Sequence, residues 1–314
     1  MSSVTNREGG ALAGGTAGAA MAGSALAGPA PTAGAGARAR LWADAGRDYL
    51  EAALRAVVGP VAGFALFVLV WQVVAMRIPE IPTPGVTWQA AVTLFADPFY
   101  DNGPNDKGIG WNLLASLQRV GIGFGLAALV GIPVGFAIGR YAPVRAMFSP
   151  IVSLLRPVSP LAWLPLGLLL FKAANPAAIW AIFICSIWPM IINTAVGVSR
   201  VPQDYLNVAR VLNLSEWKVT TKVLLPAVLP YMLTGVRLSI GTAWLVIVAA
   251  EMLTGGTGIG FWLWDEWNNL KVEHIVIAIF VIGIVGLILE TLLVALAHAF
   301  DAYEFLHGAI PRCR

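Results

Sequence analysis

The 314-residue sequence predicts an all-α integral membrane protein with six transmembrane helices. Hydrophobic residues make up 58% of the chain and charged residues only 12%, whereas a soluble domain carries about 25% charged residues. Six apolar runs are long enough to cross a bilayer as helices, since about twenty residues span its roughly 30 Å hydrocarbon core. Each run must be helical, because a backbone inside lipid finds its hydrogen bonds only within the chain. The runs lie near residues 57–76, 116–138, 148–171, 177–197, 237–253 and 275–298.

The segments before and after the first run are predicted to lie outside the membrane core. Residues 1–40 are rich in Ala and Gly and lack hydrophobic periodicity, so we expect a disordered tail rather than a signal peptide. Residues 41–77 are expected to form an amphipathic lead-in followed by the first transmembrane helix. Residues 78–111 form a long, turn-rich loop with many Pro, Gly and Asp residues.

The distribution of positive charge predicts the orientation. With the N-terminus inside, fourteen Lys and Arg residues fall in the inside segments 1–56, 139–147, 199–237 and 299–314. Only four fall outside: Arg77, Lys107, Lys172 and Lys271. Because positive residues concentrate on the cytoplasmic side, both termini and the 199–236 loop are predicted to be cytoplasmic.

Two runs carry internal features that predict how they pack. In the second run, small residues recur every four positions and form one face that lets another helix approach closely; they are Gly123, Ala127, Gly131, Gly135 and Gly139. In the third run, prolines predict a kinked or broken helix with freed carbonyl groups; they are Pro150, Pro157, Pro160 and Pro165.

The sequence offers no catalytic residues and no metal site. The three histidines lack metal-ligand spacing, and no G-x-x-x-x-G-K-[ST] phosphate-binding loop occurs. Cys185 is expected to be an apolar filler inside a run and Cys313 an incidental residue near the C-terminus. The GGTGIG cluster at 255–260 is interpreted as a flexible turn between two spans. The chain is therefore predicted not to be an enzyme, and to bind no cofactor itself.

The 199–236 loop contains charged, helix-patterned sequence ending in prolines. Asn213 stands where one short helix would stop, because Asn tolerates the left-handed conformation, and Ser215 is suited to cap the next. Pro226 and Pro230 mark the passage into the fifth span. A short amphipathic helix here would either fit a groove on a partner protein or lie on the lipid surface, and spacing alone leaves both open.

The stretch NVARVLNLSEWKVTTKVLLP resembles the E-A-A-x3-G-x9-I-x-L-P signature of the permease subunits of bacterial ABC importers. Asn207 stands at the Glu position and Asn213 at the Gly position, while Val223, Leu225 and Pro226 match its end. The resemblance implies that this segment is the coupling helix that contacts separate ATPase subunits, which bind the ATP. The coupling residues that it implies are Asn207, Val208, Ala209, Leu212, Asn213, Leu225 and Pro226.

Further blocks narrow the resemblance to the nitrate permease branch, close to its bicarbonate and cyanate relatives. They include LRPVSPLAWLPL, IWPMIINTAVGVSRVPQDYLNVARVL and AAEMLTGGTGIGFWLWDEWNN. The resemblance covers residues 57–305 and implies a type I, MetI-like core in residues 112–305, with the first span as an addition. It also implies a bacterial inner-membrane location, a second permease subunit as a homodimer partner, and a periplasmic or lipid-anchored solute-binding protein. No nucleic-acid partner is expected.

Two arginines inside apolar runs are candidates for the anion pathway. A charge there costs about 3 kcal/mol on insertion scales and usually faces a cavity or a partner, and a guanidinium offers forked donors to an oxyanion. Arg119 and Arg156 are these candidates; the alternatives are snorkelling or pairing with Glu251 or Glu290. Candidates for an outer gate or a binding-protein docking site are Glu251, Trp264, Asp265, Glu266 and Asn268.

We therefore expect a permease subunit for import of nitrate or nitrite. A bicarbonate, cyanate, taurine or alkanesulfonate permease is the alternative within the same family. A stand-alone secondary anion carrier is a further alternative, for which inverted repeats would be expected; none is visible in the sequence.

Overall fold

The computed structural model describes residues 58–103 and 106–306, with side chains described to residue 296. The expected tail 1–40, the lead-in 41–56 and Cys313 lie outside the described residues. The chain divides into two compact units, Met1–Leu66 and Phe67–Arg314. The helix Val58–Arg77 begins in the first unit and ends in the second; every other described element belongs to the second unit.

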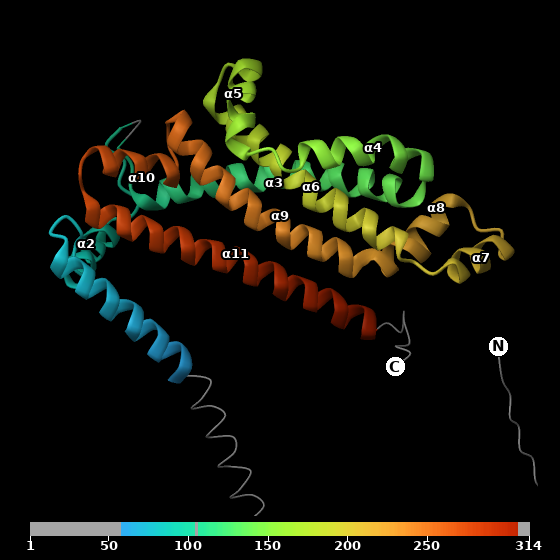
Figure 1. The fold of residues 1–314 in the computed structure, drawn as a ribbon, viewed down its shortest axis with the longest axis horizontal. Coiled ribbons are helices and arrows are strands. Elements are labelled where there is room, and N and C mark those ends of the chain that lie inside the picture. Colours follow the sequence, from blue (N-terminus) through green and yellow to red (C-terminus); the bar gives the residue numbers. More distant parts are fainter. Residues whose placement is uncertain (1–57, 104–105, 307–314) are drawn as a thin grey trace, which may run out of the picture. The chain divides into compact units, whose positions relative to one another are not determined.

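The regular structure of the described residues is helical, as predicted, apart from one isolated β-bridge between Asp101 and Lys107. After the first helix follow α2 (Pro84–Ala96), α3 (Ile109–Arg140), α4 (Ala142–Leu155), α5 (Pro160–Phe171), α6 (Ala174–Ser199), α7 (Gln203–Val211), α8 (Glu216–Lys218), the π-helical η1 (Val219–Leu224), α9 (Leu225–Thr254), α10 (Ile259–Asn268) and α11 (Val272–Leu306) (Figure 1).

Five helices of the described chain are long and apolar enough to cross a membrane: Val58–Arg77, Ile109–Arg140, Ala174–Ser199, Glu216–Thr254 and Val272–Leu296. The third predicted span is a bent pair, in which α4 and α5 meet at 101°. Counted as one span, the pair completes the six that the sequence predicts. The break follows from the prolines, because Pro157 and Pro160 lack the N–H that a continuous helix needs and disfavour helix in the residue before them.

Several boundaries differ from the sequence-based expectation. The 78–111 segment is not only a loop, because it contains α2, whose N-cap Thr83 accepts the Val86 N–H at 3.4 Å. The fifth span begins at Leu225, well before residue 237, and α10 was not predicted as a helix. The start of α9 was placed too late because Pro226 and Pro230 suggest a break, whereas α9 accommodates Pro226 in its first turn and Pro230 inside the helix. Helix α10 was missed because its apolar run is short and ends in charged and polar residues.

The small-residue face of α3 packs within the chain, against α6. A Cβ at Gly135 would lie 2.7 Å from Thr194 Cβ, and one at Gly139 would lie 2.5 Å from Val198 Cβ. All five small residues of the face are buried. The expectation that this face serves close helix packing is confirmed, and its partner is α6.

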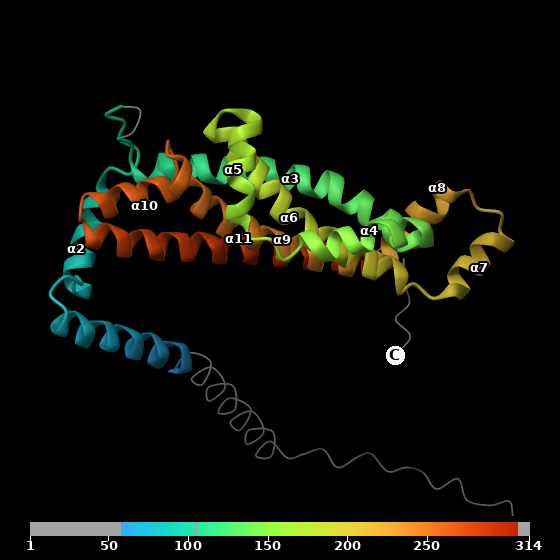
Figure 2. The same ribbon diagram turned by 45° about the horizontal axis from the view of Figure 1, so that its top comes forward.

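Helix α9 contacts α3, α5, α6, α10 and α11 (Figure 2). Ser239 Oγ donates a buried hydrogen bond to the Ser186 carbonyl of α6 at 2.7 Å. On the opposite side, Trp244 Nε1 donates to the Ile282 carbonyl of α11 at 2.9 Å. Because α9 is fixed on both sides, it positions the segments at its two ends, α7–α8 before it and α10 after it.

Replacing Gly135 with Leu is expected to destabilise the protein by about 3 kcal/mol, because the side chain cannot fit against Thr194 and overpacked cores lose 1–3 kcal/mol or more. The midpoint of thermal unfolding in detergent, followed by size-exclusion chromatography, measures the loss. Gly125→Leu on the same helix is the matched control, since nothing lies within 4 Å of a Cβ there. Equal midpoints for the two variants would contradict the close α3–α6 contact.

Candidate functional site

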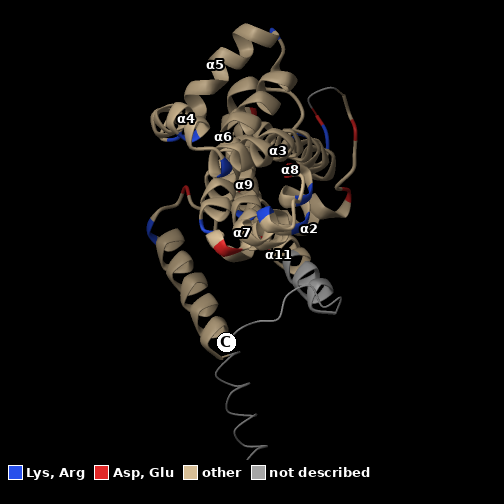
Figure 3. Ribbon diagram, turned by 90° about the vertical axis from the view of Figure 1, so that its right-hand side faces the viewer, with Lys and Arg blue, Asp and Glu red and all other residues tan. Residues whose placement is uncertain are grey.

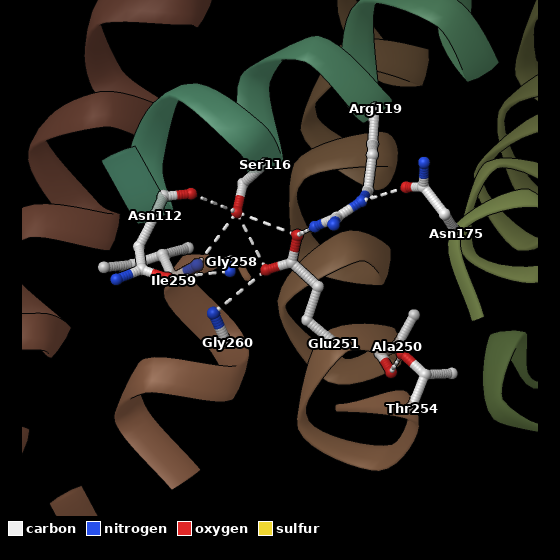
Figure 4. A network of polar contacts seen from close by, with 10 residues as sticks. All are labelled: Asn112, Ser116, Arg119, Asn175, Ala250, Glu251, Thr254, Gly258, Ile259 and Gly260. Carbon is white, nitrogen blue, oxygen red and sulfur yellow. Dashed lines mark hydrogen bonds and ion pairs between the residues drawn. The ribbon is translucent and has the colours of Figure 1, made fainter. Parts of the chain in front are cut away.

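A buried carboxylate near the end of α9 connects several helices. The Glu251 side chain is 2% exposed, and Ser116 Oγ of α3 lies 2.8 and 2.9 Å from its two oxygens. Arg119 Nη1 donates to Oε1 at 2.5 Å, and the backbone N–H of Gly260 donates to Oε2 at 3.0 Å (Figure 4). The charge is thus compensated by one arginine and by hydrogen bonds, as a buried carboxylate requires.

The same network fixes the second half of the GGTGIG loop. Gly258 N–H donates to Asn112 Oδ1 and Ile259 N–H donates to Ser116 Oγ, each at 2.9 Å. A Cβ at Gly258 would lie 2.3 Å from Glu251 Cδ, and one at Gly260 would lie 2.2 Å from the Val248 carbonyl oxygen. The expected flexible turn is therefore wrong for residues 258–260, where Gly258 and Gly260 leave room for the close approach of the backbone to Glu251 and Val248.

The Arg119 guanidinium donates hydrogen bonds to two different side chains. Besides Glu251, its Nε donates to Asn175 Oδ1 at the start of α6 at 2.5 Å, and its side chain is 15% exposed. Of the interpretations weighed for Arg119, pairing with Glu251 is the one that the structure shows. The network joins α3, α6, α9 and α10, so Glu251 holds elements together inside the protein.

Sequence reasoning missed the other members of this network. Asn112, Ser116 and Arg119 lie on one face of α3 at spacings of four and three residues, which place side chains next to each other on a helix. This polar stripe within an apolar run was a usable signal. The participation of Asn175 and Gly260 depends on contacts between distant segments and carries no such signal.

The expected acidic rim on α10 is only partly exposed. Glu266 is buried; its Oε2 lies 3.0 Å from His274 Nδ1 and 3.5 Å from Lys271 Nζ. Burial raises the pKa of Glu266, but the hydrogen bond and charge of His274 and the charge of Lys271 outweigh it and hold this pKa below its usual range. Glu266 is thus ionised and internally paired, which corrects its assignment to an exposed docking surface.

The other expected rim residues differ in exposure. The neighbouring Trp262 is a core residue, buried and stacked on His274 with ring centroids 5.9 Å apart. Trp264 and Asn268 are exposed, and Asp265 is half-buried. Of the candidate residues on α10, Trp264, Asp265 and Asn268 remain available to a partner, and Trp267 beside them is also exposed.

The α7–α8 segment lies at the opposite end of α9 from α10 (Figure 1). Helix α7 ends in a left-handed residue, Asn213, with φ of 47°. The Leu214 N–H donates to the Ala209 carbonyl and the Asn213 N–H to the Arg210 carbonyl, each at 3.0 Å, which is the Schellman arrangement. Ser215 Oγ then accepts the Lys218 N–H at 3.4 Å. Both sequence-based predictions, a stop at Asn213 and a cap at Ser215, are confirmed.

This segment carries an exposed apolar surface, which we call the α7–α8 surface. Leu206 and Ala209 are buried and anchor α7, with Val219 and Leu224 in the same cluster. The members of the surface are Tyr205, Val208, Val211, Leu212 and Trp217, between 57% and 81% exposed. Figure 3, which looks onto this end, shows Lys and Arg around α7 and α8. Of the expected coupling residues, Val208 and Leu212 are thus exposed, whereas Ala209 supports the fold.

Two cavities lie beside the α4–α5 break. The larger, about 790 Å³, is lined by residues of α3, α4 and α6 that include Arg145, Ser149 and Ser199. The smaller, about 310 Å³, is lined by residues of α6 and α9 that include Asn193 and Thr242. Arg156, which follows α4 directly, lines both.

Glu251→Gln is expected to lower stability by about 3 kcal/mol, because it leaves the largely buried Arg119 without its counter-charge. Asp101→Asn is the matched control: that aspartate pairs with Lys107 outside the membrane-spanning helices, and the two side chains are 50% and 28% exposed, so its loss should stay within about 1 kcal/mol. Unfolding in mixed micelles with increasing SDS measures both. Equal losses in the two variants would show that the Glu251 network does not hold the helices together.

Comparisons with known proteins agree with this architecture. A family model described as "Binding-protein-dependent transport system inner membrane component" matches residues 129–302. The chain is 46% identical to the nitrate import permease protein NrtB of Synechocystis sp., over 74% of this chain and 86% of that protein. It is 49% identical to NrtB of Leptolyngbya laminosa, over 73% and 82% of the two chains.

Bicarbonate permeases are similar to nearly the same extent. The bicarbonate transport system permease protein CmpB of Synechococcus elongatus is 45% identical, over 76% of this chain and 87% of that protein. Among solved structures, an inward-facing form of the MetNI methionine ABC transporter matches with a TM-score of 0.50 at 16% identity, over 65% of this chain and 98% of that one. This match supports the MetI-like permease fold. The chain is a multi-pass inner-membrane protein and belongs to the family of binding-protein-dependent transport system inner membrane components.

Proposed function

We propose that this chain is the permease subunit of an ATP-driven importer of nitrate, or of the closely related nitrite. The observation that carries the proposal is its identity of 46% and 49% to two nitrate import permeases over most of both chains. Import of bicarbonate is the second candidate, because a bicarbonate permease is 45% identical over a similar share.

The α7–α8 surface is the contact for separate ATPase subunits. Large exposed apolar side chains outside the spans favour a docking site for a partner, and Asn213 and Ser215 hold the short helices in place without it. The sequence has no phosphate-binding loop of its own. ATP is therefore bound by the partner subunits, and their movement reaches the spans through η1 and α9, which continue directly from α8.

The orientation places this surface in the cytoplasm. The concentration of Lys and Arg in the inside segments supports cytoplasmic termini and a cytoplasmic coupling loop, 199–236. The opposite end, with the periplasmic segment 78–111 and the exposed face of α10, then receives the anion from a solute-binding protein. A second copy of the permease unit, 112–305, completes the pathway.

The transport proposal is tested with the complete complex in vesicles. Vesicles that contain the purified chain, its ATPase subunits and the binding protein are expected to take up nitrate only when ATP is present on the side of the membrane that carries the ATPase subunits. Parallel measurements with labelled bicarbonate decide between the two substrates. Nitrate uptake by the permease chain alone would instead identify a stand-alone carrier and contradict the proposal.

The docking surface is tested with Val208→Asp and Val211→Asp, both at exposed positions, where folding is preserved. We expect at least a tenfold loss of ATPase copurification, since a charge placed in an apolar interface is left desolvated and unpaired, and tenfold corresponds to about 1.4 kcal/mol. Trp88→Ser, exposed on α2, is the control and should keep the ATPase bound. Wild-type copurification of both Asp variants would rule out this surface as the contact.

A further inference from the structure

We propose that Arg156 binds the transported anion at the α4–α5 break, between the two cavities. The ligand class is a small planar oxyanion with a single negative charge. The inference takes the direction of transport from the proposed function. It does not depend on whether the transported anion is nitrate or bicarbonate. It assigns one residue of this chain to direct contact with the substrate.

The position of Arg156 lies within the depth of the helix bundle. Arg156 lines the smaller cavity together with Cys185 and Asn193 of α6. At a rise of 1.5 Å per residue, these two residues lie about 17 and 29 Å from the start of α6. On α9 Arg156 lies beside Thr242, about 18 Å before the end of that helix. Because a hydrocarbon core is about 30 Å thick, this depth belongs to the interior of the membrane.

Four other arginines of the described helices have partners. Arg119 pairs with Glu251 and Arg140 with Glu216, and Arg237 pairs with Glu290. Arg145 donates to the Ile138 carbonyl at 3.2 Å and to the Gly139 carbonyl at 2.5 Å. Three of these guanidinium groups are thus paired with carboxylates, whereas Arg145, which lines the larger cavity, keeps its charge but is held by two backbone carbonyls.

Arg156 differs from this group. Among the described residues, no side chain or carbonyl hydrogen-bonds to its guanidinium and no carboxylate pairs with it. Arg156 is an exposed residue, as is Leu154 two positions before it at 72%, and neither cavity includes a carboxylate among its described lining residues. An uncompensated charge at membrane depth is costly and marks an ion pathway. A passing anion supplies the missing counter-charge.

The surroundings suit a small oxyanion. The guanidinium can donate two parallel hydrogen bonds to two oxygens of a planar anion. Ser153 lies three residues earlier on the same helical face and also lines the larger cavity, while Asn193 and Thr242 add polar groups in the smaller one. At about 30 Å³ per water molecule, the smaller cavity of about 310 Å³ accommodates a partly hydrated anion.

Transport by the reconstituted complex tests the assignment. Arg156→Gln is expected to reduce uptake at limiting anion concentration at least tenfold, while ATPase copurification stays at the wild-type level because no residue of the α7–α8 surface lines either cavity beside Arg156. Arg156→Lys should restore part of the uptake, since it keeps the charge but loses the fork. Arg77→Gln, an exposed arginine at the end of the first helix, is the control. Wild-type uptake by Arg156→Gln would overturn the proposal.

Thiol labelling gives a second test that does not depend on turnover. In the same complex with Cys185→Ser and Cys313→Ser, a cysteine introduced by Ser153→Cys is labelled with anionic sulfonatoethyl or neutral methyl methanethiosulfonate. Adding Arg156→Gln should lower the ratio of anionic to neutral labelling rates about fivefold. An unchanged ratio, as for an arginine that snorkels to the membrane surface, would overturn the proposal.

The two proposals fail in different ways. Uptake is measured with nitrate, nitrite and bicarbonate in parallel for the wild type and for each variant. If the wild type takes up bicarbonate but not nitrate, the nitrate assignment fails, while a tenfold loss of bicarbonate uptake in Arg156→Gln would still support the anion site. If nitrate uptake is normal in the wild type and in Arg156→Gln, only the anion site fails.

Discussion

The Glu251 carboxylate is the interaction on which the arrangement of the helices at the α10 end depends. A charge in a protein interior is tolerated only when hydrogen bonds and a counter-charge replace water. Ser116, Arg119 and Gly260 provide this replacement from α3 and α10. Because Arg119 also reaches Asn175 on α6, the carboxylate fixes three neighbouring helices relative to α9.

The two sides of α6 differ: the side that faces α3 is closely packed and forms a fixed part, whereas the side that faces α4 and α5 borders cavities and forms an open part. Against α3, glycines without side chains allow backbone approach, and packing leaves no room for a Cβ at Gly135 or Gly139. Against the α4–α5 pair, prolines break the helix and two cavities remain. A transport pathway needs both the packed side and the open side, because a cavity keeps its shape only when one of its walls is rigid. The charges follow this division: Arg119 is paired in the fixed part and Arg156 is unpaired beside the cavities.

Much of the coupling segment could be predicted from the sequence because its determinants are local. The stop at Asn213 and the cap at Ser215 depend on residues within one or two turns, and both are confirmed. The buried side of α7 is different: Leu206 and Ala209 turn inward while Val211 and Leu212 remain exposed. Which side of a short helix is buried depends on its neighbours, here η1 and α9, and a sequence pattern on nine residues cannot decide it.

The sequence by itself determined the membrane class, the spans, the broken third span and the close-packing face of α3. Each follows from hydropathy, proline chemistry or residue size along a single segment. Only the tertiary structure decided that Arg119 pairs with Glu251, that Glu266 is buried beside His274, and that Arg156 is left without a partner. The physical reason is that compensation of a buried charge depends on which groups the fold brings within hydrogen-bonding distance. Arg119 and Glu251 are 132 residues apart in the chain, and even for Glu266 and His274, which are 8 residues apart, the contact requires the turn between α10 and α11.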